Sequence, residues 1–196
     1  MNDLPTRLRQ VANQIPAGAS VLDVGCATGT LLQYLRDVKG VDGRGIELDR
    51  NRVAVAVARG LSVVQGDAEH DLAAFPDLSV DYAVLSEALQ AMMQPAAILA
   101  ELLRIGHRAI VAFPNFGHWR VRFDLLLRGR MPVTPGLPQS WYETENIHLC
   151  TVADFRALAQ EQGYRIESES YLSGEQAISF WPNLRADHAL FVLSRG

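Results

Sequence analysis

The sequence predicts an α/β protein, a three-layer sandwich in which a mostly parallel sheet lies between layers of helices. Two observations point to this fold class. Apolar strands alternate with helical segments up to about residue 113, as in parallel sheets that are covered on both faces. The last two predicted strands, 164–171 and 187–194, have no helix-length segment between them and should therefore pair antiparallel. We expect a seven-stranded sheet whose last strand is antiparallel.

Local signals define the elements of the first half. Apolar residues on one helical face indicate a helix over 4–15, with Asp3 as its N-cap and Pro16 as its stop. A later helix should begin after Asp49, its N-cap, and end just before Gly60. The elements predicted here are helix 4–15, strand 20–24, helix 29–37, strand 43–48, helix 50–58 and strand 61–65.

In the second half, the regular alternation stops at residues 114–150, which contain four prolines and little strand character. Helical periodicity returns at Thr151 and Asp154, which form a capping box. Pro95 suits the first turn of an earlier helix. The remaining predicted elements are strand 81–86, helix 95–104, strand 109–113 and a helix from 151 to about 163, followed by the last two strands.

Size and composition limit the possible functions. A chain of 196 residues can bury one core but not two, so we expect residues 1–196 to form a single domain. The net charge of −4 predicts no bulk attraction to nucleic acid or to an anionic membrane. No apolar run approaches the roughly 20 residues of a membrane span. A start without signal-peptide features and only two cysteines, Cys26 and Cys150, favour a cytoplasmic protein.

The most informative stretch is residues 20–29, Ser-Val-Leu-Asp-Val-Gly-Cys-Ala-Thr-Gly. A strand, a tight glycine turn and a helix follow one another, an arrangement that places a cofactor at the carboxyl edge of a parallel sheet. A dinucleotide site requires the spacing G-x-G-x-x-G and binds pyrophosphate, which Asp23 would repel, so NAD-dependent oxidoreduction is not expected. An anion before the turn suits the amino group of an amino-acid ligand instead. The cofactor-binding residues predicted here are Asp23, Gly25, Cys26, Ala27 and Gly29.

Polar side chains also end the next predicted strands. Glu47 lies 24 residues after Asp23 (47 − 23), close to the offset at which an acid accepts hydrogen bonds from ribose hydroxyls. Asp67 follows the third strand, and Ser86 ends the fourth, where it would border the amino-acid end of the ligand. Because parallel strands deliver such residues to one edge of the sheet, we expect all of them to line one crevice.

The glycine turn resembles the first motif of class I S-adenosylmethionine-dependent methyltransferases. This resemblance implies the fold of that class, a cofactor that is S-adenosylmethionine or S-adenosylhomocysteine, and a contact between Asp67 and the adenine amino group. The family turn usually has glycine where this chain has Ala27, and we expect the methyl group to be tolerated if the φ angle there is negative. Cys26 is interpreted as a small apolar filler.

No catalytic residue and no metal site are predicted. Within residues 114–150, His118, Glu143 and His148 are the plausible general bases, and each is more typical of a hydrogen-bonded structural residue. The sequence contains no His-x-x-x-His or paired Cys-x-x-Cys spacing.

Several longer motifs resemble the MetW family of methionine-biosynthesis proteins. They are Ala-Phe-Pro-Asn-Phe-Gly-His-Trp-Arg at 112–120, Gly-Arg-Met-Pro at 129–132, Trp-Tyr at 141–142, Asn-Ile-His-Leu-Cys-Thr at 146–151, Leu-Gln-Ala at 89–91 and Arg-Ile-Gly at 104–106. The resemblance spans nearly the whole chain. It implies an S-adenosylmethionine-binding, methyltransferase-like protein that acts with homoserine O-acyltransferase and supports the acylation of homoserine.

Two questions stay open at this point. The apolar face formed around Trp119 and Phe123 is compatible with a helix packed on its own sheet, with a lid over an acceptor pocket, or with a docking surface. The protein is either an accessory factor that activates homoserine O-acyltransferase or a methyltransferase that acts on a small molecule, by aligning the acceptor with the activated methyl group.

Overall fold

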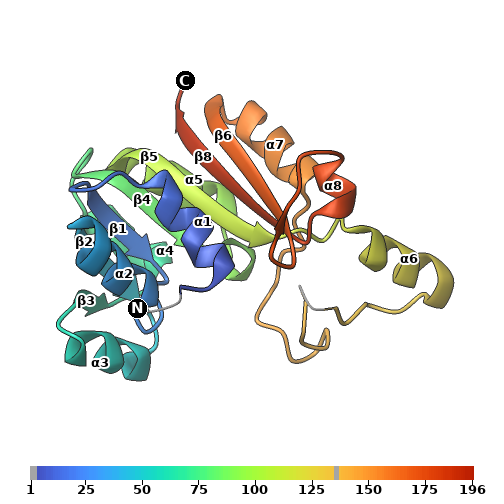
Figure 1. The fold of residues 1–196 in the computed structure, drawn as a ribbon, viewed down its shortest axis with the longest axis horizontal. Helices are drawn as coiled ribbons and strands as arrows, with labels where there is room; N and C mark the ends of the chain where they lie inside the picture. Colours follow the sequence, from blue (N-terminus) through green and yellow to red (C-terminus); the bar gives the residue numbers. More distant parts are fainter. Residues whose placement is uncertain (1–3, 135–136) are drawn as a thin grey trace.

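The fold is built on one mixed sheet. The computed structural model describes residues 4–134 and 137–196. In this part of the chain the sheet has eight strands in the order β3-β2-β1-β4-β5-β8-β6-β7 (Figure 1). The strands are β1 Ser20–Val24, β2 Asp42–Glu47, β3 Ser62–Gln65, β4 Val80–Ser86, β5 Gly106–Pro114, β6 Tyr164–Ser173, β7 Gln176–Ala177 and β8 His188–Arg195.

Strand directions agree with the predicted fold class. Neighbouring strands among β1 to β5 pair parallel, and β8 pairs antiparallel with both β5 and β6. One strand was not expected: β7 pairs antiparallel with the end of β6, just after Gly174 in the left-handed conformation. A strand of two residues carries no alternation pattern, and for this reason seven strands were predicted where the described residues form eight.

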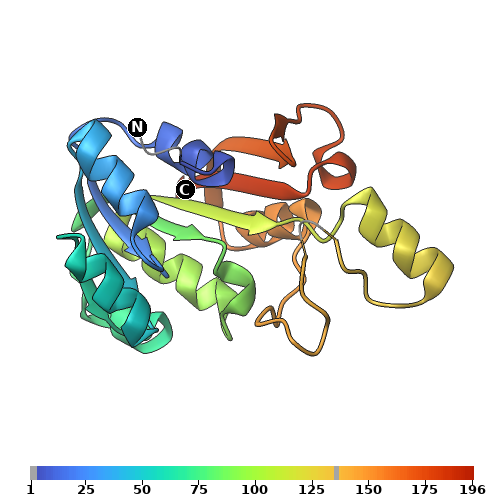
Figure 2. The ribbon, with the colours of Figure 1, turned by 60° about the horizontal axis from the view of Figure 1, so that its bottom comes forward.

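Helices cover both faces of the sheet (Figures 1 and 2). One buried cluster joins one face to α5 and α7, and a second joins the other face to α1 and α2. This arrangement confirms the three-layer sandwich. The helices are α1 Thr6–Gln14, α2 Thr30–Lys39, α3 Arg50–Ala58, α4 Ala68–Asp71, α5 Pro95–Ile105, α6 Trp119–Arg128, α7 Val152–Glu161 and α8 Pro182–Arg185, with 3-10 turns at Leu72–Ala74 and Leu89–Ala91.

The predicted helix signals act as expected where the structure describes them. Asp49 caps α3 by accepting from the amide of Asn51 at 2.7 Å, and Thr151 and Asp154 form the capping box of α7. The α1 helix ends at Gln14, ahead of the predicted stop. The expected N-cap Asp3 lies outside the described residues.

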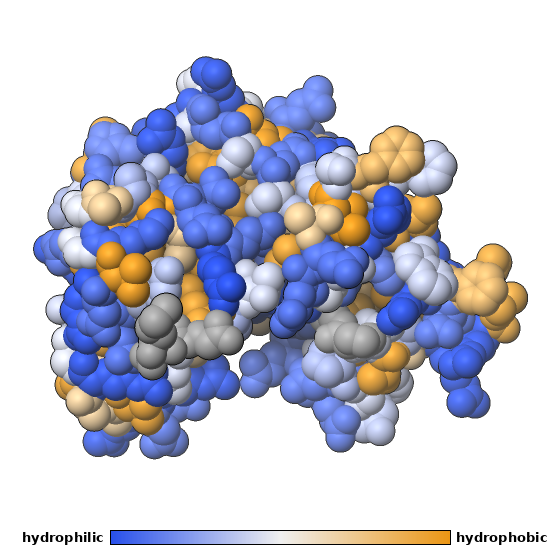
Figure 3. All heavy atoms as spheres, viewed as in Figure 1, coloured by the Kyte–Doolittle hydropathy of each residue, from blue (hydrophilic) through white to orange (hydrophobic). Residues whose placement is uncertain are grey.

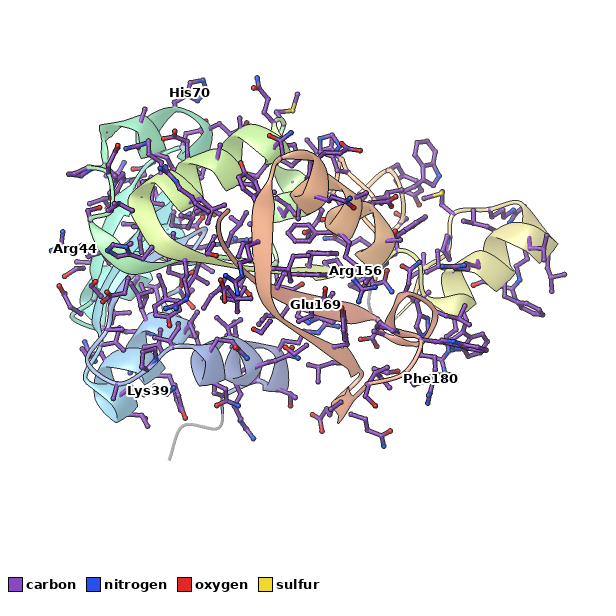
Figure 4. All side chains as sticks on the ribbon, turned by 90° about the horizontal axis from the view of Figure 1, so that it is seen from above. Lys39, Arg44, His70, Arg156, Glu169 and Phe180 are labelled. Atoms are coloured by element: carbon purple, nitrogen blue, oxygen red, sulfur yellow. The ribbon has the colours of Figure 1, made fainter. Side chains whose placement is uncertain are left out.

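Two side-chain links tie helices to neighbouring elements, and Figure 4 labels Lys39, Arg156 and Glu169 among the residues involved. Lys39, at the end of α2, donates to the Ile15 carbonyl at 2.6 Å and so fixes α2 against the end of α1. Arg156 on α7 donates to Glu169 on β6 at 3.1 Å. The first bond therefore joins two helices of one layer, and the second joins a helix of the other layer to the sheet.

Residues 114–150, which we call the arm, leave the sheet after β5. Figures 1 and 2 show α6 extending away from the sheet at one end of the molecule. Val121 is the buried residue of this helix. The interpretation of α6 as a helix packed on its own sheet is therefore wrong. The arm returns to the body where the amides of Ile147 and His148 donate to the Gln90 carbonyl, each at 2.9 Å.

Among the described residues, no helix combines the length and the apolar character needed to cross a membrane.

Candidate functional site

Two adjoining hollows lie at the carboxyl ends of β1, β2 and β4. The larger hollow has a volume of about 310 Å³ and the smaller one about 200 Å³. Gly25, Ala27, Ser86 and Glu87 line both, so the two form one crevice. The larger hollow is also lined by Glu47, Arg52, Asp67, Met92 and Glu145, and the smaller by Leu8, Asp23, Cys26 and Thr30.

The glycine turn after β1 forms the floor of this crevice. Gly25 and Gly29 have φ angles of +72° and +77°, the left-handed conformation that glycine adopts without a side-chain clash. A Cβ atom at Gly29 would collide with the side chain of Leu61. Gly29 itself is absent from the described lining of both hollows, so its part is to shape the turn and start α2.

Ala27 has a conformation that the sequence analysis did not expect. Its φ angle is +48°, whereas tolerance of its methyl group was argued for a negative value. A left-handed alanine costs about 1 kcal/mol relative to its ordinary conformation. The Ala27 amide donates to Glu47 Oε2 at 2.8 Å, and this bond helps to hold the strained turn. Strain of this kind gathers at ligand sites.

Glu47 ends β2 and is 6% exposed. Its second oxygen, Oε1, accepts from the amide of Asp49 at 3.0 Å, so the carboxylate links the glycine turn to the start of α3. Each carboxylate oxygen has two lone pairs. Each Glu47 oxygen can therefore accept a further bond, and Glu47 is part of the lining of the larger hollow.

Asp23 is buried without a hydrogen-bond partner. It is 3% exposed, and none of the described residues donates to its carboxylate. Burial, followed by the negative charge of Glu47, raises the pKa of Asp23 to about 7. Ser86, at the end of β4, also has a buried hydroxyl without a partner. Buried polar groups of this kind are rare unless something bonds to them, and a ligand with hydrogen-bond donors in the smaller hollow would meet both needs.

Asp67 and Cys26 have structural tasks as well. Asp67 caps α4 by accepting from the amide of Glu69 at 3.0 Å, and its other oxygen lies 3.1 Å from His70 Nδ1. Burial, with the nearby charges of Asp23 and Glu47, raises the pKa of the Cys26 thiol to about 12, so it is no nucleophile at neutral pH. Cys26 packs in the cluster between α2, α3 and β3, as an apolar filler would.

Glu87 is the important lining residue that the sequence analysis missed. It follows Ser86 with a φ angle of +63°, and its carboxylate pairs with His188 at the start of β8 and lies 3.6 Å from Arg7 on α1. Burial opposes ionisation, but the hydrogen bond and charge of His188 and the charge of Arg7 outweigh it and lower the pKa of Glu87. No sequence signal marks an acidic residue in a left-handed conformation, so only the structure could find it.

The possible general bases of the arm, His118, Glu143 and His148, are absent from the described lining of both hollows. His118 caps α6, since its Nδ1 accepts from the Arg120 amide at 3.3 Å, and burial lowers its pKa. Glu143 and His148 are exposed and do not line either hollow. In the described part of the chain, no three His, Cys, Asp or Glu side chains come together as metal ligands would.

Comparison with known proteins identifies relatives along nearly the full chain. The family model described as "Methionine biosynthesis protein MetW" matches residues 6–193. The chain is 35% identical over 194 residues to the bifunctional methionine biosynthesis protein MetXA/MetW of Rhodopirellula baltica, covering 92% of this chain and 31% of that protein. It thus spans about a third of that relative. It is 31% identical to the ubiquinone biosynthesis O-methyltransferase of Xylella fastidiosa, covering 85% of this chain and 69% of that enzyme.

Solved structures show the same fold. A TehB-like S-adenosylmethionine-dependent methyltransferase from Corynebacterium glutamicum superposes with a TM-score of 0.66 and 19% identity, covering 100% of this chain and 90% of that one. At this level of identity the likeness concerns the fold alone.

Proposed function

The chain belongs to the MetW family of methionine biosynthesis proteins, and from this premise we propose that it binds S-adenosylmethionine and activates homoserine O-acyltransferase. In this proposal residues 1–196 form one methyltransferase-like domain in the cytoplasm, with the arm as its docking insert. The observation that carries the proposal is the combination of a crevice with unpaired buried polar groups and an arm with exposed aromatic side chains.

The crevice fits the two ends of the cofactor. The larger hollow would take the adenosine, with the free lone pairs of Glu47 accepting from the ribose hydroxyls and Asp67 near the adenine amino group. The smaller hollow would take the amino-acid end, whose ammonium group supplies the partner that the Asp23 carboxylate lacks. Gly25, Ala27 and Ser86, which line both hollows, would lie between the two ends of the ligand. Cys26 lines the smaller hollow, while its side chain packs in the apolar cluster of α2, α3 and β3. When bound, the cofactor supplies an activated methyl group to methyltransferases; here we propose that it serves as a signal.

Exposed aromatic residues support the docking role of the arm. Two exposed tryptophans lie in the arm, Trp119 (48% exposed) and Trp141 (70% exposed), and the third, Trp181, precedes α8 outside the arm and is 63% exposed. Trp181 stacks on Phe180, which Figure 4 shows pointing outward, and Arg122 of α6 donates to the neighbouring Asn183 carbonyl at 3.4 Å. Figure 3 shows hydrophobic side chains gathered around the α6 end of the molecule. Exposed aromatic clusters of this kind favour a protein interface.

The partner is suggested by the relative from Rhodopirellula baltica, whose name joins a MetXA and a MetW protein in one chain. MetXA corresponds to the homoserine O-acyltransferase that the family resemblance implies. Fusion of two activities into one chain is expected when the separate proteins work as a complex. This supports the acyltransferase as the protein that the arm binds.

A second candidate function is methyl transfer to a small molecule. It is favoured by the 31% identity to the ubiquinone biosynthesis O-methyltransferase and by the crevice itself. However, the three bases that the sequence singles out, His118, Glu143 and His148, are absent from the described lining of both hollows. The one arm carboxylate in the described lining is Glu145, in the larger hollow.

The test is co-purification of the chain with the acyltransferase of its own organism, followed by acylation assays with and without the chain. We expect a stable complex and faster acylation of homoserine, together with S-adenosylmethionine binding in calorimetry. A chain that neither binds nor stimulates the acyltransferase, but methylates a small acceptor, would support the second candidate instead.

A further inference from the structure

Negative charge dominates the walls of the crevice. Five carboxylates line the two hollows among the described residues, those of Asp23, Glu47, Asp67, Glu87 and Glu145. Among the described lining residues, Arg52 is the one base, and it lies 4.0 Å from Asp49; Arg7 and His188 contact Glu87 without being part of this lining. A site with this imbalance attracts cationic ligands more strongly than neutral ones of the same shape.

Glu87 occupies the point where the two hollows meet. Of the four residues that line both hollows, Gly25, Ala27, Ser86 and Glu87, it alone carries a charge. The left-handed conformation of Glu87 turns the chain after β4, and its carboxylate is held by the fully buried His188. Because its pKa is lowered, this carboxylate is ionised at neutral pH.

The sulfur of the cofactor would lie at this same junction. If the adenosine fills the larger hollow and the amino-acid end reaches Asp23 in the smaller one, the sulfur that connects them passes between the two. S-adenosylmethionine carries a positive sulfonium there, whereas S-adenosylhomocysteine carries a neutral thioether. The two ligands therefore differ in charge at the one position where Glu87 provides the opposite charge.

We infer that Glu87 is a specificity-determining residue that makes this crevice prefer S-adenosylmethionine to S-adenosylhomocysteine. The inference rests on the proposed function, since it assumes that the crevice binds these molecules. A carboxylate a few ångströms from a cation in a partly buried site changes its affinity by about tenfold or more. Such a preference suits a protein that responds to the supply of the methylated cofactor rather than one that must release the demethylated product in every cycle.

The experiment is calorimetric titration of the full chain with S-adenosylmethionine, S-adenosylhomocysteine and sinefungin. Sinefungin has a protonated amine on carbon in place of the sulfonium and so tests charge without a transferable methyl group. We expect the parent chain to bind both cationic ligands about tenfold tighter than S-adenosylhomocysteine. Glu87→Gln, which keeps the shape and a hydrogen-bonding oxygen for His188, should bring the three affinities close together by weakening the cationic ligands only.

A second variant tests the same idea in the opposite direction. Arg7 partly neutralises Glu87 from α1, so Arg7→Gln should widen the preference for the cationic ligands. This variant also keeps the test valid if Glu87→Gln does not fold, which thermal melting would reveal. Glu161→Gln, an exposed change at the end of α7, is the control for net charge and should leave all three affinities unchanged.

The outcomes separate the inference from the function on which it rests. Equal affinities in the parent chain, or an unchanged ratio in Glu87→Gln, would overturn the role of Glu87 while leaving cofactor binding intact. Binding of none of the three ligands would overturn both. A preference for S-adenosylmethionine that sinefungin does not share would assign the discrimination to the methyl group and not to charge, and would also overturn the inference.

Discussion

The crevice and the arm differ in the kind of group that each leaves without a partner. In the crevice, polar groups are buried and unpaired, as at Asp23 and Ser86. In the arm, apolar side chains are exposed, and Leu126 is 81% accessible to solvent. A small polar ligand would satisfy the first region, whereas only a large apolar surface would satisfy the second. The contrast separates a ligand site from a docking site within one chain.

The largest expected effect is on the free energy of unfolding, when a glycine in each of the two regions is replaced by alanine. Gly29 and Gly129 both have positive φ angles, but a side chain at Gly29 would strike Leu61, whereas nothing lies near a side chain at Gly129, the C-cap of α6. We expect Gly29→Ala to lower the free energy of unfolding by about 3 kcal/mol and Gly129→Ala by about 1 kcal/mol. Urea unfolding measures the free energy of unfolding of each variant. An equal decrease in the two variants would show that the turn at Gly29 is no more constrained than the C-cap at Gly129.

The docking role of the arm predicts a loss of binding without a loss of stability. Trp119→Ala should weaken acyltransferase binding by about 2 kcal/mol or more, because an aromatic side chain in the centre of an interface is a typical hot spot. Its melting temperature should stay close to that of the parent, since Trp119 is half exposed. Val64→Ala on β3, also exposed, is the matched control. Unchanged affinity in the folded Trp119 variant would remove the arm from the interface.

The ligand role of the crevice predicts a loss of cofactor binding without a loss of acyltransferase binding. Glu47→Ala should weaken S-adenosylmethionine binding by about 1.5–3 kcal/mol, because charge-assisted bonds to the ribose would be lost. Acyltransferase binding without cofactor should be unaffected. Glu47→Gln separates charge from shape, since it keeps one oxygen to accept the bond from Ala27. Calorimetry that gives the same affinity for the parent and both variants would contradict the ribose assignment.

Proton binding at Asp23 gives the crevice a pH dependence. The pKa of Asp23 is raised to about 7, so below that pH the carboxylate is protonated and offers no charge to an ammonium group. Affinity for S-adenosylmethionine should therefore rise by up to about tenfold per pH unit below 7 and level off above it. Without ligand, the free energy of unfolding should decrease as the pH rises from about 4 to 7. In this range the folded chain still holds the Asp23 proton, whereas the unfolded chain has already released it.

Asp23→Asn is the control for this pH effect. This variant should bind the cofactor weakly. Its affinity should change by less than about threefold between pH 5.5 and 7.5. Persistence of the full pH dependence in this variant would assign the titration to another group.

The smallest effect concerns Ala27. Ala27→Gly removes the strain of the left-handed alanine, worth about 1 kcal/mol, but adds a similar freedom to the unfolded chain. We expect the free energy of unfolding to change by less than about 0.5 kcal/mol, and cofactor affinity to stay equal or increase. A large loss of stability would show that the alanine methyl group makes contacts that matter to the turn.

The sequence was sufficient for every described strand except the two-residue β7 and for the acids at the strand ends of the crevice, because these depend on local rules. Apolar strands, the caps at Asp49 and Thr151, and the acids at strand ends are set by residue type and spacing. The position of α6 was not predictable, since the same helical pattern suits a buried or an exposed face. Neither Glu87 nor the φ angle of Ala27 was predictable, because left-handed conformations outside glycine depend on tertiary contacts.

The place of β8 has a consequence for the synthesis of this protein. β8 leaves the ribosome after β5 and β6, yet it lies between them in the sheet. Until it is made, the growing chain carries two strand edges without partners, and unpaired edges invite pairing with other chains. Glu87 also lacks His188 during this time, so the crevice is completed together with the sheet. We therefore expect ligand binding only after β8 has paired between β5 and β6. A chain truncated before His188 should not bind the ligand.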